Sequence, residues 1–183
     1  HTIWSPYNRL DINAFYVEDV DGNPVRVGTE LTVQHAWYQS ALDLSPEFIQ
    51  EVGIKSPENE EAFQKIAESY DLPYWLVPAG SRVVVVGSGM GNNVAAALRN
   101  EMGSVDAVEI DPAIVDLGIQ YHPEHPYSDP KVQVVVDDAR SFFNTTHKTY
   151  DLVVFGLLDS HTLLSGFSSV RLAAQGKPTG GRR

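Results

Sequence analysis

The sequence contains no cysteine among its 183 residues, which excludes disulfide bonds and thiolate metal sites and fits a reducing, cytoplasmic location. No apolar run approaches the roughly 20 residues that span a membrane, and the first residues lack a basic segment followed by an apolar one. Positive charge is scarce: 13 lysines and arginines stand against 24 aspartates and glutamates, a formal net charge of −11. Such a surface repels phosphate backbones, so we expect no nucleic-acid partner.

Two patterns divide the first part of the chain. Residues 1–40 are rich in β-branched and aromatic residues, with a turn signal (DGNP) at 21–24 and apolar residues at alternate positions after it. We expect a small N-terminal β-hairpin domain there. In residues 41–80, Ser45 and Ser56 each precede a proline, which is typical of a helix N-cap, so we expect a helical connector.

From residue 81 the predicted elements alternate between strand and helix. The segments RVVVVG, VDAVEI, KVQVVV and YDLVVFG are the four predicted strands, and helix-forming segments lie between them. Alternation at this spacing predicts βαβ units with right-handed crossovers on a parallel sheet. We therefore expect an α/β, Rossmann-like domain over residues 81–171. Residues 172–183 are Gly-rich and without pattern, so we expect a tail that is disordered or left over from cloning.

Three glycines mark the turn from the first of these strands into its helix. Gly87, Gly89 and Gly91 lie at the carboxyl end of a parallel strand, where ligands bind in such sheets. Glu109 ends the next strand, about 20 residues on, where an acidic residue accepts hydrogen bonds from ribose hydroxyls. The alternatives are a tight strand-to-helix turn for the glycines and a solvated carboxylate for Glu109.

The glycine spacing favours one ligand class over another. The dinucleotide fingerprint is Gly-x-Gly-x-x-Gly, but here its third glycine would fall on Asn92. Asp137 and Asp138 end the third strand, where a carboxylate can accept from an adenine amino group. These features favour S-adenosylmethionine over NAD, although Asp138 has the alternative role of a helix N-cap.

Four blocks of the sequence together resemble one family. They are VVVVGSGMGNNVAAAL, VDAVEIDPAIVDLG, HPYSDPKVQVVVDDARSFF and YDLVVFGLLDS. They resemble the class I S-adenosylmethionine-dependent methyltransferase superfamily, specifically its spermidine-synthase-like branch, and SPYNRLDI and HAWYQ are similar to N-terminal segments of that branch. The resemblance implies a Rossmann-like sheet preceded by a small β domain. Because that sheet has seven strands and only four are predicted here, we expect a fragment truncated after the fourth strand.

The resemblance also implies roles for individual residues. Glu109 would bind the ribose, Asp138 the adenine, and the glycines the methionine portion of the cofactor. The residues it implies in cofactor binding are Gln39, Gly87, Gly89, Gly91, Glu109 and Asp138.

Two positions depart from the branch. Met90 stands where spermidine synthases usually have an aspartate that holds the amine of decarboxylated S-adenosylmethionine, and Gly156 stands where a second aspartate helps to deprotonate the acceptor. Asp159 survives as an acidic residue of that segment, and His161 could relay a proton near the sulfur, so we predict both as catalytic. Their alternatives are a loop cap and a surface histidine.

These departures lead us to predict methyl transfer from S-adenosylmethionine to an unidentified small acceptor, an amine being one candidate. The alternatives are aminopropyl transfer from decarboxylated S-adenosylmethionine, as in spermidine synthase, and a non-catalytic adenosine-binding domain. An NAD-dependent oxidoreductase is a weaker alternative. A homodimer is left open. Some bacterial members of the branch carry membrane-spanning helices ahead of the domain. We therefore also leave open that these residues are a cytoplasmic domain of a longer, membrane-attached chain.

Two other groups of residues invite a function. His122, Glu124 and His125 suggest a metal site, but the prolines between them prevent the spacing of ligands on one helix face, so we expect a structured loop and no metal. Tyr7, Trp37 and Tyr38 could form a wall of an adenosine site or simply pack within the hairpin.

Overall fold

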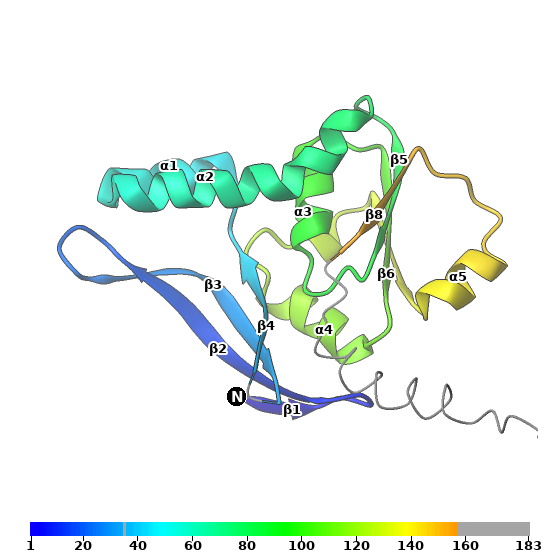
Figure 1. Cartoon of the computed structure of the whole chain (residues 1–183), viewed down its shortest axis with the longest axis horizontal. Helices are drawn as coiled ribbons and strands as arrows, with labels where there is room; N and C mark the ends of the chain where they lie inside the picture. Colours follow the sequence, from blue (N-terminus) through cyan, green and yellow to red (C-terminus); the bar gives the residue numbers. More distant parts are fainter. Residues whose placement is uncertain (35, 157–183) are drawn as a thin grey trace, which may run out of the picture.

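The computed structural model describes residues 1–34 and 36–156. Its N-terminal part is a four-stranded antiparallel sheet in the order β1-β2-β3-β4 (Figure 1). The strands are β1 (Thr2–Trp4), β2 (Arg9–Glu18), β3 (Pro24–Val33) and β4 (Ala36–Leu42). The predicted turn joins β2 to β3, because the carboxylate of Asp19 accepts hydrogen bonds from the N–H groups of Asp21 and Asn23.

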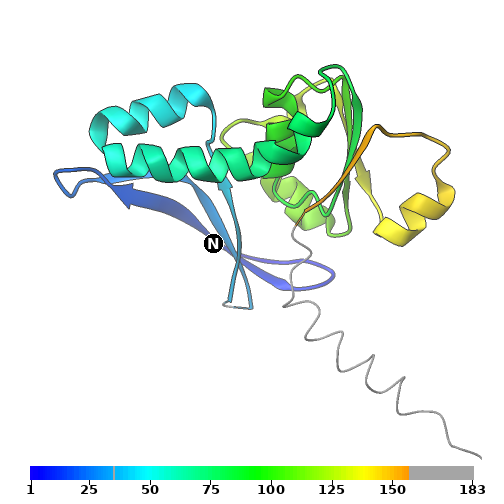
Figure 2. The same cartoon turned by 45° about the horizontal axis from the view of Figure 1, so that its top comes forward.

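Two helices follow this sheet, α1 (Pro46–Lys55) and α2 (Pro57–Asp71), and the 3₁₀ helix η1 (Leu72–Leu76) continues the second. Ser45 caps α1 as predicted, since its Oγ accepts from the Phe48 N–H. Ser56 holds the equivalent place before α2, but its side chain makes no capping hydrogen bond. Val52 of α1 and Phe63 of α2 belong to a small hydrophobic core between these helices and the β2–β3 hairpin. Figures 1 and 2 show the helices lying over that sheet.

The second sheet is parallel, in the order β7-β6-β5-β8, and confirms the predicted α/β fold class. Its strands are β5 (Arg82–Val86), β6 (Ser104–Glu109), β7 (Val132–Val136) and β8 (Leu152–Phe155). The connecting helices are α3 (Asn92–Arg99), α4 (Pro112–Tyr121), the short η2 (Pro126–Ser128) and α5 (Ala139–Thr145). Among the described residues, β8 is an edge strand.

The valine run of β5 is explained by burial on both faces. Val83 and Val85 pack with α3 on one face of the sheet, whereas Val84 and Val86 pack with Phe142 of α5 on the other. All four valines are at most 1% exposed.

A third core joins the two sheets. Leu10 and Leu31 of the N-terminal sheet pack against Leu117 of α4 and against Met90 from the loop after β5. This contact holds the antiparallel sheet beside the carboxyl ends of the parallel strands, and it thereby forms one wall of the cleft described next.

Some predictions lie outside the described residues. These are the catalytic candidates Asp159 and His161 and the tail at 172–183. Within residues 1–34 and 36–156, no helix combines the length and apolar character needed to cross a membrane.

Candidate ligand-binding cleft

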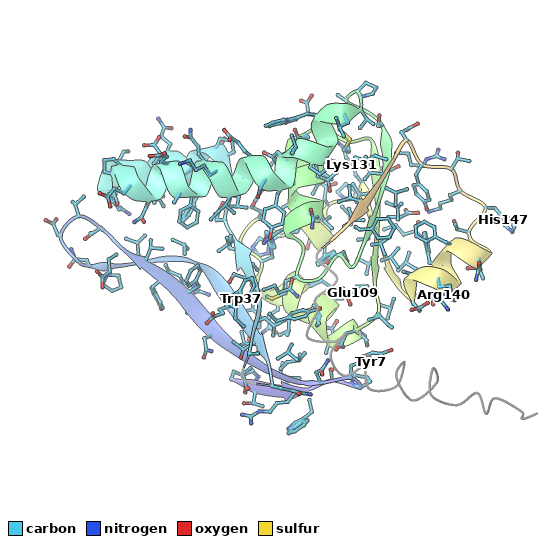
Figure 3. All side chains as sticks on the ribbon, in the orientation of Figure 1. Tyr7, Trp37, Glu109, Lys131, Arg140 and His147 are labelled. Carbon is cyan, nitrogen blue, oxygen red and sulfur yellow. The ribbon has the colours of Figure 1, made fainter. Side chains whose placement is uncertain are left out.

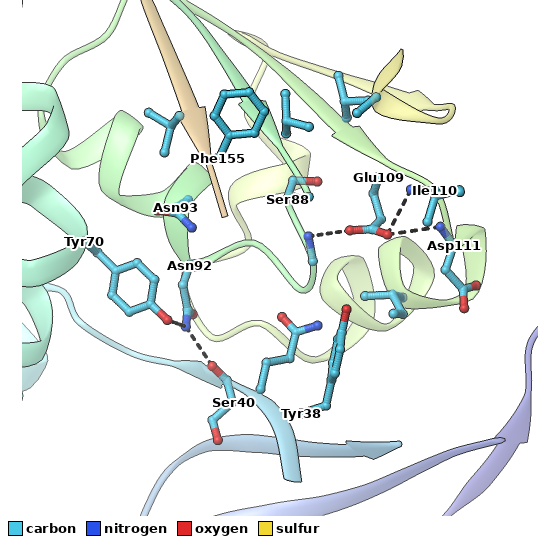
Figure 4. A pocket seen from close by; sticks show the side chains of 18 of the residues that line it. Tyr38, Ser40, Tyr70, Ser88, Asn92, Asn93, Glu109, Ile110, Asp111 and Phe155 are labelled. Atoms are coloured by element: carbon cyan, nitrogen blue, oxygen red, sulfur yellow. Dashed lines mark hydrogen bonds between the residues drawn. The ribbon is translucent and has the colours of Figure 1, made fainter. Parts of the chain in front are cut away.

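A cleft of about 950 Å³ lies between the N-terminal sheet and the carboxyl ends of the parallel strands. Its walls include Gly87 and Glu109 from the parallel sheet, Gln39 from β4 and Tyr70 from α2 (Figure 4). A cleft of this size suits a small organic ligand. Its position is also the one where open α/β sheets bind ligands.

The glycine loop, residues 87–91, follows β5 and has a backbone that other residues adopt only with strain. Gly87, Gly89 and Gly91 have φ angles of 68°, 57° and 115°. The N–H groups of Gly87 and Ser88 both donate to the Val108 carbonyl, at 2.9 and 3.0 Å, which ties the loop to β6. The glycines are therefore required by the backbone, and at Gly89 also by the close approach of the Gln39 amide to the space that a Cβ would occupy.

The predicted cofactor residues Gln39, Gly87 and Gly89 come together in this cleft, although Gln39 lies about fifty residues earlier in the chain. Gln39 is half-buried on β4, and its Oε1 accepts a hydrogen bond of 3.0 Å from the Met90 N–H. Gly91 is placed differently: it precedes α3 as its N-cap and packs against Pro126 and Tyr127, away from the cleft wall.

Glu109 lies at the end of β6 with its carboxylate turned toward backbone donors. Its Oε2 accepts from the Gly89 N–H at 2.9 Å, and its Oε1 accepts from the N–H groups of Ile110 and Asp111 at 2.9 and 3.1 Å (Figure 4). Burial raises the pKa of this carboxyl, and the three hydrogen bonds oppose that rise. A carboxylate has about four acceptor positions, so Glu109 retains capacity for a ligand hydroxyl.

Asp137 and Asp138 lie at the same end of the cleft, after β7. The Oδ1 of Asp138 accepts from the N–H groups of Arg140 and Ser141, at 2.9 and 3.2 Å, so Asp138 is the N-cap of α5. Its Oδ2 makes no hydrogen bond with another described residue, and Asp138 as a whole residue is exposed. Capping α5 therefore leaves one oxygen for an adenine amino group.

Aromatic side chains from distant segments also line the cleft. Trp37 comes from β4 and Tyr7 from the loop between β1 and β2 (Figure 3), whereas Tyr70 comes from α2 and Phe155 from β8. Tyr38 of β4, predicted together with Tyr7 and Trp37, also lines the cleft, whereas Tyr70 and Phe155 were not predicted. Tyr70 falls on the buried face of its helix and Phe155 on an apolar strand, and those patterns signal core packing only.

Neither of the two positions that depart from the spermidine-synthase-like pattern presents a side chain to the cleft. Met90 is 1% exposed and lies in the core between the two sheets. At Gly156, a Cβ would collide with the Gly87 carbonyl oxygen, and its N–H donates to the Val86 carbonyl at 2.8 Å. A carboxylate at position 156 is thus incompatible with this backbone.

The HPEHPYS segment (122–128) supports the glycine loop from outside the cleft. The Tyr127 hydroxyl donates to the Gly89 carbonyl at 2.6 Å. Glu124 forms an ion pair with Arg99 at 2.7 Å and accepts from the Leu44 N–H. His122 is fully buried, and this burial lowers the pKa of its imidazole to about 3. Across residues 1–34 and 36–156, no three His, Cys, Asp or Glu side chains are arranged to hold a metal ion.

Comparison with solved structures gives the fold class first. The chain is similar to a spermidine synthase crystallised with the transition-state analogue AdoDATO, with a TM-score of 0.58 and 16% identity over 87% of this chain and 47% of that one. It is also similar to the spermidine synthase from Thermotoga maritima, with a TM-score of 0.56 and 16% identity over 84% of this chain and 47% of that one. The fold is therefore that of the class I methyltransferase-like proteins.

Comparison of sequences then identifies the family. The sequence model described as "Spermine/spermidine synthase domain" matches residues 70–173, more than half of the chain. The polyamine aminopropyltransferases of Salmonella arizonae and Salmonella newport are each 33% identical over 81 residues, which is 42% of this chain and 28% of theirs. The chain belongs to the spermine/spermidine synthase domain family. It spans about half the length of the solved relatives, and its match covers less than a third of the curated ones.

Proposed function

We propose that the cleft binds decarboxylated S-adenosylmethionine and that this chain forms the donor-binding part of a polyamine aminopropyltransferase. One observation carries the proposal: Gly87 and Gly89 of the glycine loop line the same cleft as Glu109 and Asp138, at the carboxyl ends of neighbouring parallel strands. Family membership favours aminopropyl transfer over the methyl transfer predicted from Met90 and Gly156, because the curated relatives that match are aminopropyltransferases.

Three groups of this chain would hold the donor. The unpaired oxygen of Asp138 would accept from the adenine amino group, and the remaining capacity of Glu109 would accept from a ribose hydroxyl. The sulfonium end would lie against Gly87 and Gly89, where the absence of side chains leaves the backbone accessible. Gln39, which already bonds to this loop, would face the same end of the donor.

When bound, the donor supplies an electrophilic carbon beside its sulfonium. The amine nitrogen of the acceptor would form a bond to that carbon as the carbon–sulfur bond breaks, and the thioether product would leave with both electrons of that bond. The chain's contribution to this step is chiefly to hold the two reactants in line. A base must also take a proton from the ammonium form of the acceptor, so that its nitrogen has a free electron pair, and Asp159, which follows β8 in the sequence, is our candidate for that base.

Methyl transfer remains a second candidate because of the same two departures. Met90 offers no carboxylate to hold the free amine of decarboxylated S-adenosylmethionine, and Gly156 offers none to deprotonate an amine acceptor. The choice of donor therefore separates the two candidates.

Calorimetric titration with decarboxylated S-adenosylmethionine, S-adenosylmethionine and NADH tests the proposal. We expect the decarboxylated donor to bind most tightly, and binding to be weakened about tenfold or more in Glu109→Gln. Glu61→Gln is the matched control, because Glu61 is an exposed residue of α2 paired with Lys65. Preference for the carboxylated donor would favour methyl transfer, and binding of NADH alone would refute both candidates.

A further inference from the structure

Asn92, the first residue of α3, uses every hydrogen-bonding position of its side-chain amide. Its Nδ2 donates to the Ser40 carbonyl at 2.7 Å and to the Tyr70 hydroxyl at 3.1 Å (Figure 4). Its Oδ1 accepts from the Leu42 N–H at 3.1 Å and lies 3.0 Å from His122 Nε2. A primary amide has two donor hydrogens and two acceptor lone pairs, so none remains unused.

The backbone partners determine how this amide and the imidazole beside it are oriented. The Leu42 N–H can only donate and the Ser40 carbonyl can only accept, which fixes the oxygen and nitrogen of Asn92. Because the Asn92 oxygen can only accept, His122 must carry its proton on Nε2. Its Nδ1 must then be bare, and it accepts from the Glu124 N–H at 3.1 Å. One tautomer of a fully buried histidine thus satisfies all these bonds.

Asn92 therefore joins the two sheets at the point where the cleft is formed. Ser40 and Leu42 belong to β4, and Gln39, between Tyr38 and Ser40 on that strand, bonds to the glycine loop. Asn92 is the first residue of α3, directly after the glycine loop. Fixing the β4 backbone to Asn92 fixes where Gln39 meets Met90 and Gly89.

We propose that Asn92 is a positioning residue: it holds β4, and with it Gln39, in register with the glycine loop, and His122 is held as the Nε2–H tautomer to complete this bond network. The part of the proposal that concerns ligand affinity rests on the proposed function of the cleft. The part that concerns the register of β4 does not. Asn92 was not predicted as a site residue, because in the sequence it stands only where the dinucleotide fingerprint would have its third glycine.

The test combines amide hydrogen exchange with calorimetry in three variants. Asn92→Ala removes all four bonds. Asn92→Asp keeps the two acceptor bonds but places an oxygen against the Ser40 carbonyl. Asn100→Ala is the matched control, since Asn100 lies at the end of the same helix and donates only to the Ala96 carbonyl.

We expect the amides of Leu42 and Met90 to exchange about tenfold faster in both Asn92 variants, beyond any change shared by the slowest-exchanging amides of β5. The affinity for decarboxylated S-adenosylmethionine should fall about tenfold in parallel. In Asn100→Ala, Leu42 and Met90 should change no more than the β5 amides do.

Exchange that accelerates equally throughout β4 and β5 in the Asn92 variants would overturn the proposal, because it would show a general loss of stability. So would a nitrogen spectrum of His122 in the wild-type protein with the proton on Nδ1. If the wild-type protein binds no donor, the proposed function fails, and hydrogen exchange and the tautomer alone then decide the inference about Asn92.

Discussion

Burial of His122 predicts a specific loss of stability in mild acid. Its pKa is lowered by burial from 6.5 in the unfolded chain to about 3 in the folded protein. Below pH 6.5 the unfolded chain therefore takes up a proton that the folded protein refuses, so stability is greatest above pH 6.5 and falls as the pH falls toward 3. From pH 7 to pH 5 this group alone should lower the free energy of unfolding by about 2 kcal/mol, at about 1.4 kcal/mol per pH unit below the unfolded pKa.

Urea unfolding at pH 7 and pH 5 measures this effect. Other groups also titrate, and the raised pKa values of Glu109 and Glu124 oppose the trend, so the quantity to compare is the difference between wild type and His122→Gln. Gln cannot take up a proton but retains an amide N–H for Asn92. The variant should be less stable than the wild type at pH 7, but it should lack the loss of about 2 kcal/mol that His122 causes between pH 7 and pH 5. The difference in free energy of unfolding between the two proteins should therefore be about 2 kcal/mol smaller at pH 5.

The exposed His147 provides the control, and His147→Gln should follow the wild-type pH dependence. An unchanged gap between wild type and His122→Gln at the two pH values would refute the reasoning. It would mean that His122 either takes up its proton freely in the folded protein or is exposed to solvent there.

Three further predictions follow from the cleft and its supports. Gly89→Ala should cost about 1–2 kcal/mol of stability, because the φ of Gly89 is positive, and it should also weaken donor binding by displacing Gln39. Gly80→Ala is the control, because Gly80 has a similar φ of 83° but lies in open space. This variant should cost as much stability without affecting donor binding in calorimetry. Donor affinity should fall on acidification, because only the ionised Glu109 accepts fully from the ribose. The midpoint of this fall should lie above the usual Glu pKa of 4.5, because burial raises the pKa of Glu109. The same titration of Glu109→Gln should show no such midpoint. In urea unfolding, Met90→Asp should destabilise the protein by about 3–5 kcal/mol, because it leaves an unpaired charge in the core between the sheets. Met90→Leu should cost less than about 1.5 kcal/mol. Similar losses of stability in the two variants would show that position 90 is solvent-accessible.

The parallel sheet was predictable because its signals are local. The valines of β5 and β7 and the apolar run of β8 are consecutive along the chain, and β-branched runs between turn residues identify buried strands without knowledge of their partners. The glycine loop was predictable for the same reason, since three glycines before a helix require an unusual backbone.

The contacts that give the cleft its shape were not predictable, because they join residues far apart in sequence. The bonds from Asn92 to Ser40 and from Met90 to Gln39 each span about fifty residues, and nothing near Asn92 distinguishes it from an ordinary first residue of a helix. The HPEHPYS segment was predicted as a structured loop, but its contact with the glycine loop through Tyr127 depends on how α4 packs. The role of Gly156 likewise became visible only when β8 was placed beside β5.

The most direct test of the central claim is to map where the donor binds. Amide chemical shifts of the labelled protein should be recorded during titration with decarboxylated S-adenosylmethionine. We expect the largest changes at Gly87, Gly89, Ile110 and Asp138, which surround the cleft from three strand ends. Changes confined to Trp4, Arg9 and Gln34, which line a neighbouring hollow but not the cleft, would show that the donor binds elsewhere, and no change at saturating donor would show that it does not bind.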